Sequence, residues 1–510
     1  MRKSFISLLL IMCAISIRTH AQRQPNIIII ISDDHAYQTI GAYGSKHGKT
    51  PNIDRIANEG ALFKNTFVNN SICGPARATL LTGKYSHKNG FKDNETSEFD
   101  FSQDLFVKQL QQVGYNTAWV GKIHLGDKLQ GFNYYDILVG QGTYFNPDFI
   151  SKEGRHRNEG YVSDIVTEKA LNWLDTLDQN KPFCLVIGHK ATHRTWMPDP
   201  QDFGRYDTLN FPLPETFNDD YSTRKAAALQ EMSIDKDMQM GYDLKMFKSV
   251  EDMMKDGNFK RMSQAQKDSY IAYYRPIYEQ LENANLTGKA LAEWKFNRYM
   301  IDYLNTAESM DRNIGKVLDY VDQRQLTDNT IVIYLSDQGF YMGEHGWFDK
   351  RWMYEESFRT PMVMRYPPLI KPHTELNAKV VNADIAPTLL ELASVKKPAA
   401  MQGESFVHIL QKPKQEHRKD LFYHYFENGE HAVSPHFGVR DDRYKLIRYY
   451  KRVESWELFD LQKDPAELRN CYTDPAYQRV VKQMKKKLAK QIHLFDDTEA
   501  ETIFNTNIDK

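Results

Sequence analysis

The sequence has little cysteine and almost no net charge. Only 4 of its 510 residues are cysteines, with no CxxC pair among them, which excludes a scaffold held together by disulfides. Its 66 lysines and arginines balance 67 aspartates and glutamates, so the formal net charge is -1. That balance favours neither nucleic acid nor an anionic membrane surface as a partner. The composition, 41% hydrophobic and 26% charged, is typical of a globular protein with a substantial core.

A hydrophobic run of membrane-spanning length is also missing at the start of the chain. The apolar segment 5–17 is shorter than the ~20 residues that a spanning helix needs, although a membrane anchor is the alternative there. Arg2 and Lys3 precede this segment, and small residues near Ala21 suit a cleavage site. We therefore interpret 1–21 as a signal peptide and predict export to the periplasm or the extracellular space, with no membrane span.

Four short apolar runs each end in a cluster of polar, chemically capable residues. Continuous runs of this length predict strands buried on both faces, as in a parallel sheet covered by helices. Helical patterns lie between the runs, so the predicted fold class is α/β. Open sheets of this class place their sites at the carboxyl ends of the strands. The runs are 27–31, 117–120, 183–187 and 331–335.

The sequence pattern changes twice along the mature chain. The predicted α/β domain, 22–402, contains a more polar segment at about 214–297, rich in Met, Lys and Asp, which we interpret as a helical insertion. The remainder, 403–510, is predicted to be an α+β subdomain with an antiparallel meander and a final amphipathic helix. The predicted strands of the meander are 437–440, 444–450 and 456–460.

Cys73 stands in a different setting from the other cysteines. Pro75 suits the first turn of a helix and Gly83 its end, so the segment 71–84 is predicted to be a loop that enters a helix. Cys73 then lies at the helix N-terminus, where unpaired N–H groups favour an anion, and Arg77 adds a positive charge. These residues alone leave three interpretations open: a buried thiol, a thiolate nucleophile or the precursor of a modified residue.

Two pairs of oxygen-bearing side chains end two of the predicted strands. Asp33 and Asp34 follow one strand, and Asp337 and Gln338 follow another. A fold that joins these strands supplies three carboxylates and an amide oxygen, which suit a hard cation such as Ca2+ better than zinc. The alternative is that each pair only caps a turn, as Asp often does. Both pairs together favour metal ligation.

The motif Cys73-x-Pro75-x-Arg77, followed by the Thr-Gly-Lys of 82–84, resembles the signature of type I sulfatases. The resemblance extends from about 25 to 470. It implies an alkaline-phosphatase-like fold, with a large mixed, mostly parallel sheet sandwiched by helices and a smaller C-terminal antiparallel sheet with a helix. It also implies one Ca2+ per chain, and a maturation enzyme as a partner that converts the cysteine into formylglycine (3-oxoalanine).

The same resemblance assigns roles in sulfate ester hydrolysis. The formylglycine is hydrated, and one hydroxyl of the hydrate attacks sulfur while Arg77 and Lys122 steady it. His193 and Lys350 bind the sulfate and help to protonate the leaving oxygen, and His124 takes a proton as sulfate is expelled. The family commonly has Pro directly before the residue that corresponds to His193, where this chain has Thr192. The implied catalytic residues are Cys73, Arg77, Lys122, His124, His193 and Lys350, and the implied metal ligands are Asp33, Asp34, Cys73, Asp337 and Gln338.

The segment 337–356 resembles that of bacterial glycan sulfatases, most closely the type acting on 6-O-sulfated N-acetylglucosamine or glucosamine. We expect Asp349, Arg351 and His436 to contact sugar hydroxyl groups of a sulfated glycan. Trp347 and Trp352 either pack on a sugar face or belong to the core. Whether the polymer is a glycosaminoglycan such as heparan, a mucin or another glycan stays open.

Two other functions are compatible with these residues. One is a phosphate or phosphonate ester hydrolase of the same fold, which differs in its relative rates on matched aryl phosphate and aryl sulfate. The other is a catalytically silent glycan-binding homologue. Intact key residues argue against the silent protein, and desulfation that disappears in Cys73→Ala would exclude it.

Overall fold

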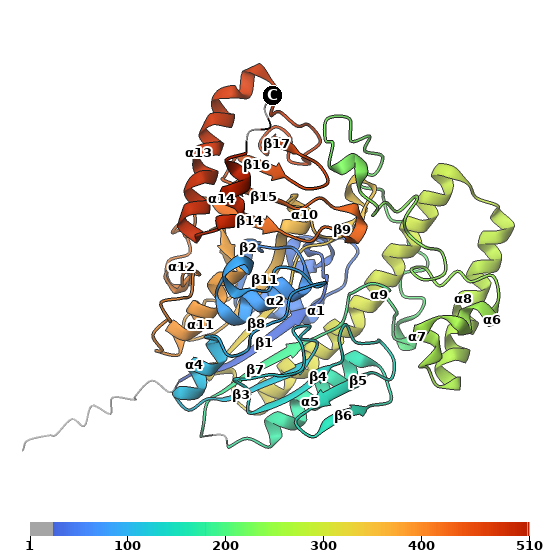
Figure 1. Ribbon diagram of the computed structural model, residues 1–510. Coiled ribbons are helices and arrows are strands. Elements are labelled where there is room, and N and C mark those ends of the chain that lie inside the picture. The colour runs from blue at the N-terminus through green and yellow to red at the C-terminus, as the bar shows by residue number, and fades with distance from the viewer. Residues whose placement is uncertain (1–23, 179, 507, 509–510) are drawn as a thin grey trace, which may run out of the picture.

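The central part of the fold is a parallel arrangement of four strands, seen in a computed structural model that describes residues 24–178, 180–506 and 508 (Figure 1). The predicted signal peptide lies outside the described residues. The four apolar runs all form strands, and these are consecutive neighbours in one sheet in the order β8-β1-β7-β3. Their polar C-terminal ends therefore meet at one edge. The strands are β8 (Thr330–Ser336), β1 (Asn26–Ser32), β7 (Phe183–Gly188) and β3 (Asn116–Gly121).

The parallel part continues from β3 to β4, and antiparallel pairs then extend both sides into an 11-stranded mixed sheet. On one side β11 pairs antiparallel with β8 and β2, and on the other β5 pairs antiparallel with β4 and β6. The predicted mixed, mostly parallel sheet is confirmed. The outer strands are β2 (Ala61–Phe67), β11 (Arg359–Arg365), β12 (Thr374–Leu376), β13 (Val380–Val381), β4 (Tyr134–Leu138), β5 (Asp148–Ser151) and β6 (Gly154–Arg157).

Helices cover both faces of the sheet, as the alternation along β1 shows. Ile28 and Ile30 belong to one core cluster, and Ile27, Ile29 and Ile31 to another on the opposite face. All five are fully buried, and each such side chain contributes roughly 1.5–3 kcal/mol to stability. The first face is covered by α1 (Pro51–Asn58), α5 (Val162–Asp175) and α9 (Gly288–Gln323), and the second by α2 (Cys73–Thr82), α4 (Phe106–Gln112) and α11 (Ile385–Leu392).

The region predicted as a helical insertion is helical only in its second half. Residues 214–249 are mostly turns, in which acidic side chains bind the backbone; Asp219, for example, accepts from the Tyr221 N–H at 3.0 Å. Such local bonds compete with helix formation. The helices begin at Val250, and α6, α7 and α8 lie to one side of the sheet (Figure 1). They are α6 (Val250–Lys255), α7 (Gly257–Lys260), α8 (Gln264–Ala284) and then α9.

A second, four-stranded antiparallel sheet follows near the C-terminus, with α13 packed on it (Figure 1). The predicted meander is confirmed and is joined by one further strand, β14. This sheet shares a core cluster with Phe67, Ile72 and Tyr85 of the α/β part. Its elements are β14 (Leu421–Tyr425), β15 (His436–Arg440), β16 (Tyr444–Tyr449), β17 (Ser455–Asp460), α13 (Gln478–Phe495) and α14 (Thr498–Phe504).

The described chain also contains short helices and strands, and none of its helices could cross a membrane. The described chain has no helix that is both long and apolar enough to do so. The short elements are α3 (Ser86–Asn89), β9 (Tyr341–Met342), β10 (Phe348–Asp349), α10 (Glu355–Phe358) and α12 (Val407–Gln411).

Candidate active site

The ends of β1 and β8 bring the two predicted oxygen-bearing pairs together. Because these strands are neighbours in parallel register, Asp33 and Asp337 leave the sheet side by side. The Asp34 N–H donates to Asp337 Oδ1 at 3.2 Å, and the Gln338 amide donates to Asp34 Oδ1. All four side chains are buried. Three carboxylates and one amide thus form a cluster from which water is largely excluded.

The donor set of this cluster fits a hard cation. Among the described residues, Asp33 Oδ1 and Gln338 Oε1 are buried and find no hydrogen-bond donor, which leaves both oxygens available to a metal. Asp33, Asp34 and His193 also place ligand atoms within 4.8 Å of one another. Burial and the neighbouring carboxylates raise the pKa of Asp34 and of Asp337 to about 7, and a bound cation would relieve that repulsion.

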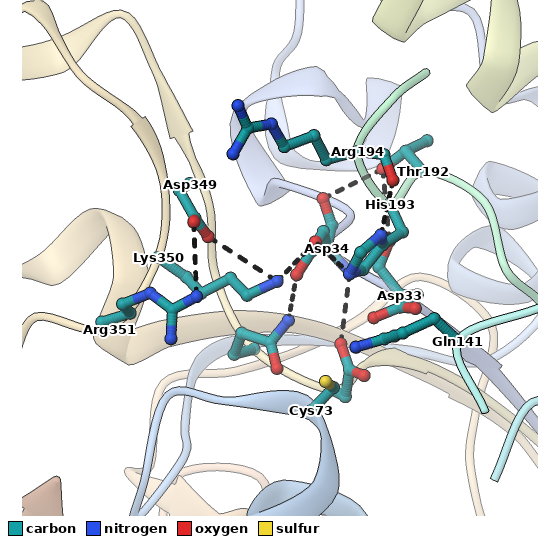
Figure 2. Close-up of polar contacts among 12 residues, drawn as sticks. Asp33, Asp34, Cys73, Gln141, Thr192, His193, Arg194, Asp349, Lys350 and Arg351 are labelled. Carbon is teal, nitrogen blue, oxygen red and sulfur yellow. Dashed lines mark hydrogen bonds and ion pairs between the residues drawn. The ribbon is translucent and has the colours of Figure 1, made fainter. Parts of the chain in front are cut away.

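Cys73 is the first residue of α2, as the sequence predicts, and it faces this cluster (Figure 2). The helix ends at Gly83, which has the left-handed φ of 62° that favours glycine at this position. Cys73 Sγ lies 3.1 Å from His124 Nδ1 and 3.5 Å from the Asn94 amide nitrogen. Burial and the nearby Lys122 lower the pKa of His124 to about 3, so its ring is neutral.

Arg77 and Lys122 are completely buried and bind the carboxylates of the cluster, Arg77 at Asp337 and Lys122 at Asp33. Arg77 Nε donates to Asp337 Oδ2 at 2.9 Å and its Nη1 donates to the Lys122 carbonyl oxygen at 2.6 Å. The Lys122 ammonium contacts Asp33 Oδ2 and the side-chain oxygen of Gln141. Burial favours protonation of Asp33, but Lys122, His193 and Arg77 outweigh burial and hold its pKa well below the usual range.

Lys350 and His193 approach Asp34 from opposite sides (Figure 2). Lys350 Nζ donates to Asp34 Oδ2 at 2.7 Å, and His193 Nε2 is 3.9 Å from the same oxygen. His193 Nδ1 donates to the Arg194 carbonyl oxygen at 2.6 Å, which leaves Nε2 directed toward the cluster. Burial disfavours a charge on Lys350, but Asp34 and Asp349 outweigh burial and raise its pKa, so the ammonium keeps its proton.

A cavity of about 350 Å³ opens above these residues and takes its wall from both parts of the chain. Asp349 and Arg351 lie in its wall, as predicted for sugar contacts. Arg351 donates to Glu427 Oε2 at 2.6 Å, and Asp349 pairs with His431 at 2.6 Å. Loop residues from the C-terminal part thus complete the cavity. Its lining is Cys73, Asn94, Glu95, His124, Gln141, His193, Arg194, Tyr242, Asp349, Lys350, Arg351, Glu427, Glu430 and His431.

The structure does not bring His436 to this cavity, so the expectation of a sugar contact there is corrected. His436 is fully buried; its Nε2 accepts from the Met353 N–H at 3.1 Å and its Nδ1 lies 2.8 Å from the Ser434 carbonyl oxygen. Both ring nitrogens are therefore used by the backbone. Trp347 and Trp352 are also fully buried and stack on each other, so they belong to the core rather than to a sugar platform.

Several cavity residues escaped the sequence reasoning because no motif marks them. Gln141 follows β4 in a loop, yet it contacts Lys122. His431 lies only five residues before His436 and is the histidine that does reach Asp349. Arg194 directly follows His193 and is held by Asp243 at 2.6 and 2.9 Å. Among these residues only Arg194 could have been predicted from the sequence, because it stands next to a predicted catalytic histidine.

Comparison with known proteins places this site in a family. The sulfatase family model matches residues 25–395, and a model described as N-sulphoglucosamine sulphohydrolase, C-terminal, matches residues 343–493. The N-acetylglucosamine-6-O-sulfatase of Bacteroides thetaiotaomicron is 42% identical over 527 residues, which cover 99% of this chain and 94% of that protein.

Solved structures agree with this placement. A protein in complex with its substrate D-glucosamine-2-N,6-O-disulfate has a TM-score of 0.91 at 41% identity, over 93% of this chain and 98% of that one. The phosphonate monoester hydrolase of Agrobacterium radiobacter, with a TM-score of 0.67 at 19% identity over 92% and 96%, shares the fold alone. The sulfatase model spans well over half of the sequence, and the chain therefore belongs to the sulfatase family of sulfuric ester hydrolases.

Proposed function

We propose that this sulfatase removes the 6-O-sulfate of N-acetylglucosamine or glucosamine residues in glycans, using Ca2+ and a formylglycine made from Cys73. The observation that carries the proposal is the position of Cys73. It begins α2, 3.1 Å from His124, and faces the buried cluster of Asp33 and Asp337. The substrates named for the two relatives that are 42% and 41% identical support the choice of sugar.

Two groups must be added to the chain in this proposal. A maturation enzyme oxidises the Cys73 thiol, and the hydrated aldehyde supplies the hydroxyl nucleophile. Ca2+ would be held by Asp33, Asp34, Asp337 and Gln338, together with residue 73, and would supply positive charge that offsets the charge of the sulfate. The unpartnered oxygens of Asp33 and Gln338 support this ligand set.

The remaining residues hold the sulfate and manage its charge. Lys122 keeps Asp33 ionised, Arg77 pairs with Asp337, and the two cations fix the floor of the site. Lys350 keeps its proton beside Asp34 and offers it, as a hydrogen bond, to the oxygen that leaves with the sugar. The sulfate also brings negative charge next to His193, which favours the protonated ring and a second hydrogen bond to the ester.

His124 completes the cycle as a base. Its neutral ring lies within reach of the side chain at position 73, where release of sulfate sets a proton free. Attack by the hydrate would first form an O–S bond to residue 73 as the O–S bond to the sugar breaks and the sugar alcohol leaves. The C–O bond of residue 73 to sulfate would then break, the carbonyl group would form again, and the proton of the second hydroxyl would pass to His124. Removal of this base should therefore affect sulfate release more than the departure of the sugar.

The sugar is proposed to bind in the wall of the cavity. Asp349 and Arg351 keep the role expected for them, and His431 takes the place of His436 because it pairs with Asp349 in the lining. The division of the chain at about 402 and the export signal at 1–21 remain parts of the proposal. Amino-terminal sequencing of protein from the native host tests the export signal, since cleavage after Ala21 is expected.

The test is a comparison of esters on purified, matured protein. N-acetylglucosamine 6-sulfate should release sulfate, the Cys73→Ala variant should release none, and a matched aryl phosphate should react more slowly than the aryl sulfate. Faster turnover of the phosphate would replace the proposal with a phosphate or phosphonate hydrolase. Failure to desulfate any sugar or aryl sulfate by protein that carries the modification would indicate a silent binding homologue.

A further inference from the structure

A second hollow opens beside the catalytic cavity and shares Asn94 and His124 with it. We call it the side groove, and its apolar surface comes from Phe91, Phe99, Phe101, Ile137, Val139 and Ile150. Its volume of about 540 Å³ lies within the ~300–1,000 Å³ of small-molecule sites. Because the two hollows meet at shared residues, a molecule bound over Cys73 can continue from one into the other.

The floor of the side groove is a preformed set of aromatic rings. The Phe99 ring packs edge-on against Phe101 at 4.7 Å and against Phe91 at 6.1 Å between centroids. Phe91 and Phe101 are almost fully buried, whereas Phe99 is only partly buried. The facing wall includes Ile137 of β4 and Ile150 of β5, which are held by the sheet. A ligand therefore meets a fixed apolar surface in which the Phe99 ring is partly accessible.

The rim of the side groove is polar and carries more negative than positive charge. Glu98 and Asp127 are exposed there, with Lys128 as the basic residue of the groove lining. Asn94 Oδ1, at the junction of the two hollows, is buried and has no hydrogen-bond donor among the described residues. An apolar floor with polar groups at the edge suits a pyranose ring, which has one C–H face and hydroxyl groups around it.

We infer that the side groove binds the sugar that is linked to the sulfated one, and that it prefers an uncharged ring at this position. The inference rests on the proposed function, because the sulfated sugar must first occupy the catalytic cavity. Continuity through Asn94 and His124 identifies the occupant as part of the same glycan. The excess of acidic groups at the rim selects against a uronic acid, whose carboxylate would be repelled by Glu98 and Asp127.

The experiment measures kcat/KM for three substrates: N-acetylglucosamine 6-sulfate, the same sugar linked to galactose, and the same sugar linked to a uronic acid. The galactose disaccharide should exceed the monosaccharide by about tenfold, and Phe99→Ala should remove that gain while leaving the monosaccharide unchanged. A disaccharide with no advantage over the monosaccharide, or an advantage kept in Phe99→Ala, overturns the inference. An equal gain from an apolar aryl aglycone does so as well, because the groove would then not recognise a sugar.

A charge variant tests the preference even if Phe99→Ala fails to fold. Glu98→Lys changes an exposed side chain and should raise the uronate-to-galactose ratio of kcat/KM by about fivefold. Glu159→Lys, an exposed acidic residue outside the groove lining, is the matched control and should leave the ratio unchanged. A native enzyme that prefers the uronate disaccharide, or an unaltered ratio in Glu98→Lys, contradicts the inference. If the native enzyme failed to hydrolyse the monosaccharide N-acetylglucosamine 6-sulfate, that result would instead count against the proposed function.

Discussion

Replacement of His124 by alanine should separate the two halves of the reaction. His124 Nδ1 lies 3.1 Å from the side chain at position 73, and no other imidazole of the described chain is placed at hydrogen-bonding distance from that side chain. Burial and Lys122 keep the ring neutral, with its pKa lowered to about 3. Loss of a positioned base costs typically ~10²–10⁴-fold. Steady-state turnover of His124→Ala should fall by that factor.

The assay follows alcohol and sulfate separately after rapid mixing with an aryl sulfate. His124→Ala should release about one equivalent of alcohol per active site and then stop, while sulfate stays with the protein. The tryptic peptide 65–77 should then gain the mass of one SO3 group. His493→Ala, which removes an exposed histidine on α13, is the control and should turn over normally.

The reasoning would be refuted if His124→Ala slowed alcohol and sulfate equally and showed no burst. That outcome would place the residue in the first half of the reaction. Full activity of the variant would show that His124 is a structural residue despite its position beside Cys73.

Three further changes test other parts of the site. Gln141→Ala removes the side-chain oxygen that holds Lys122 and should lower kcat/KM by roughly tenfold or more, because hydrogen bonds to charged groups contribute ~1.5–3 kcal/mol. The exposed residue Gln130, replaced by alanine, is the control. An unchanged kcat/KM in Gln141→Ala would exclude a role for the contact. Ca2+ at a hundred times its Kd should stabilise the native protein by about 2.7 kcal/mol in thermal unfolding. Asp337→Asn should lose most of this shift, and equal shifts in both proteins would argue against Asp337 as a ligand. His431→Ala should raise KM for a sulfated sugar by roughly fivefold, because a hydrogen-bonded pair with Asp349 is lost, with no change for a small aryl sulfate; an equal effect on both substrates would contradict a sugar contact.

The sequence predicts the centre of the fold well because local pattern and burial agree there. Five consecutive isoleucines, 27–31, predict a strand that is covered on both faces, and in the structure they lie in the fully buried strand β1. The residues at the strand ends then follow from sheet geometry, which is why Asp33 and Asp337 were predicted to meet. The position of Cys73 at a helix N-terminus was predictable because Pro75 marks the first turn of that helix and Gly83 marks its end.

The cavity wall was harder to predict because it depends on long-range packing. His436 stands in a strand, and its side chain points inward against Met353. His431 lies in the preceding loop, and only the docking of the second sheet brings it to Asp349. No local pattern distinguishes these two histidines. In 214–249, turns formed by acidic side chains replaced the expected helix, because each local bond satisfies a backbone N–H without a helical partner.

The mass of the tryptic peptide 65–77 from mature protein tests the central claim most directly. The peptide contains Cys73 and ends at Arg77. We predict that active protein carries formylglycine at position 73 and that specific activity rises in proportion to the modified fraction. Full sulfatase activity in protein whose Cys73 is an unmodified thiol throughout would contradict the account.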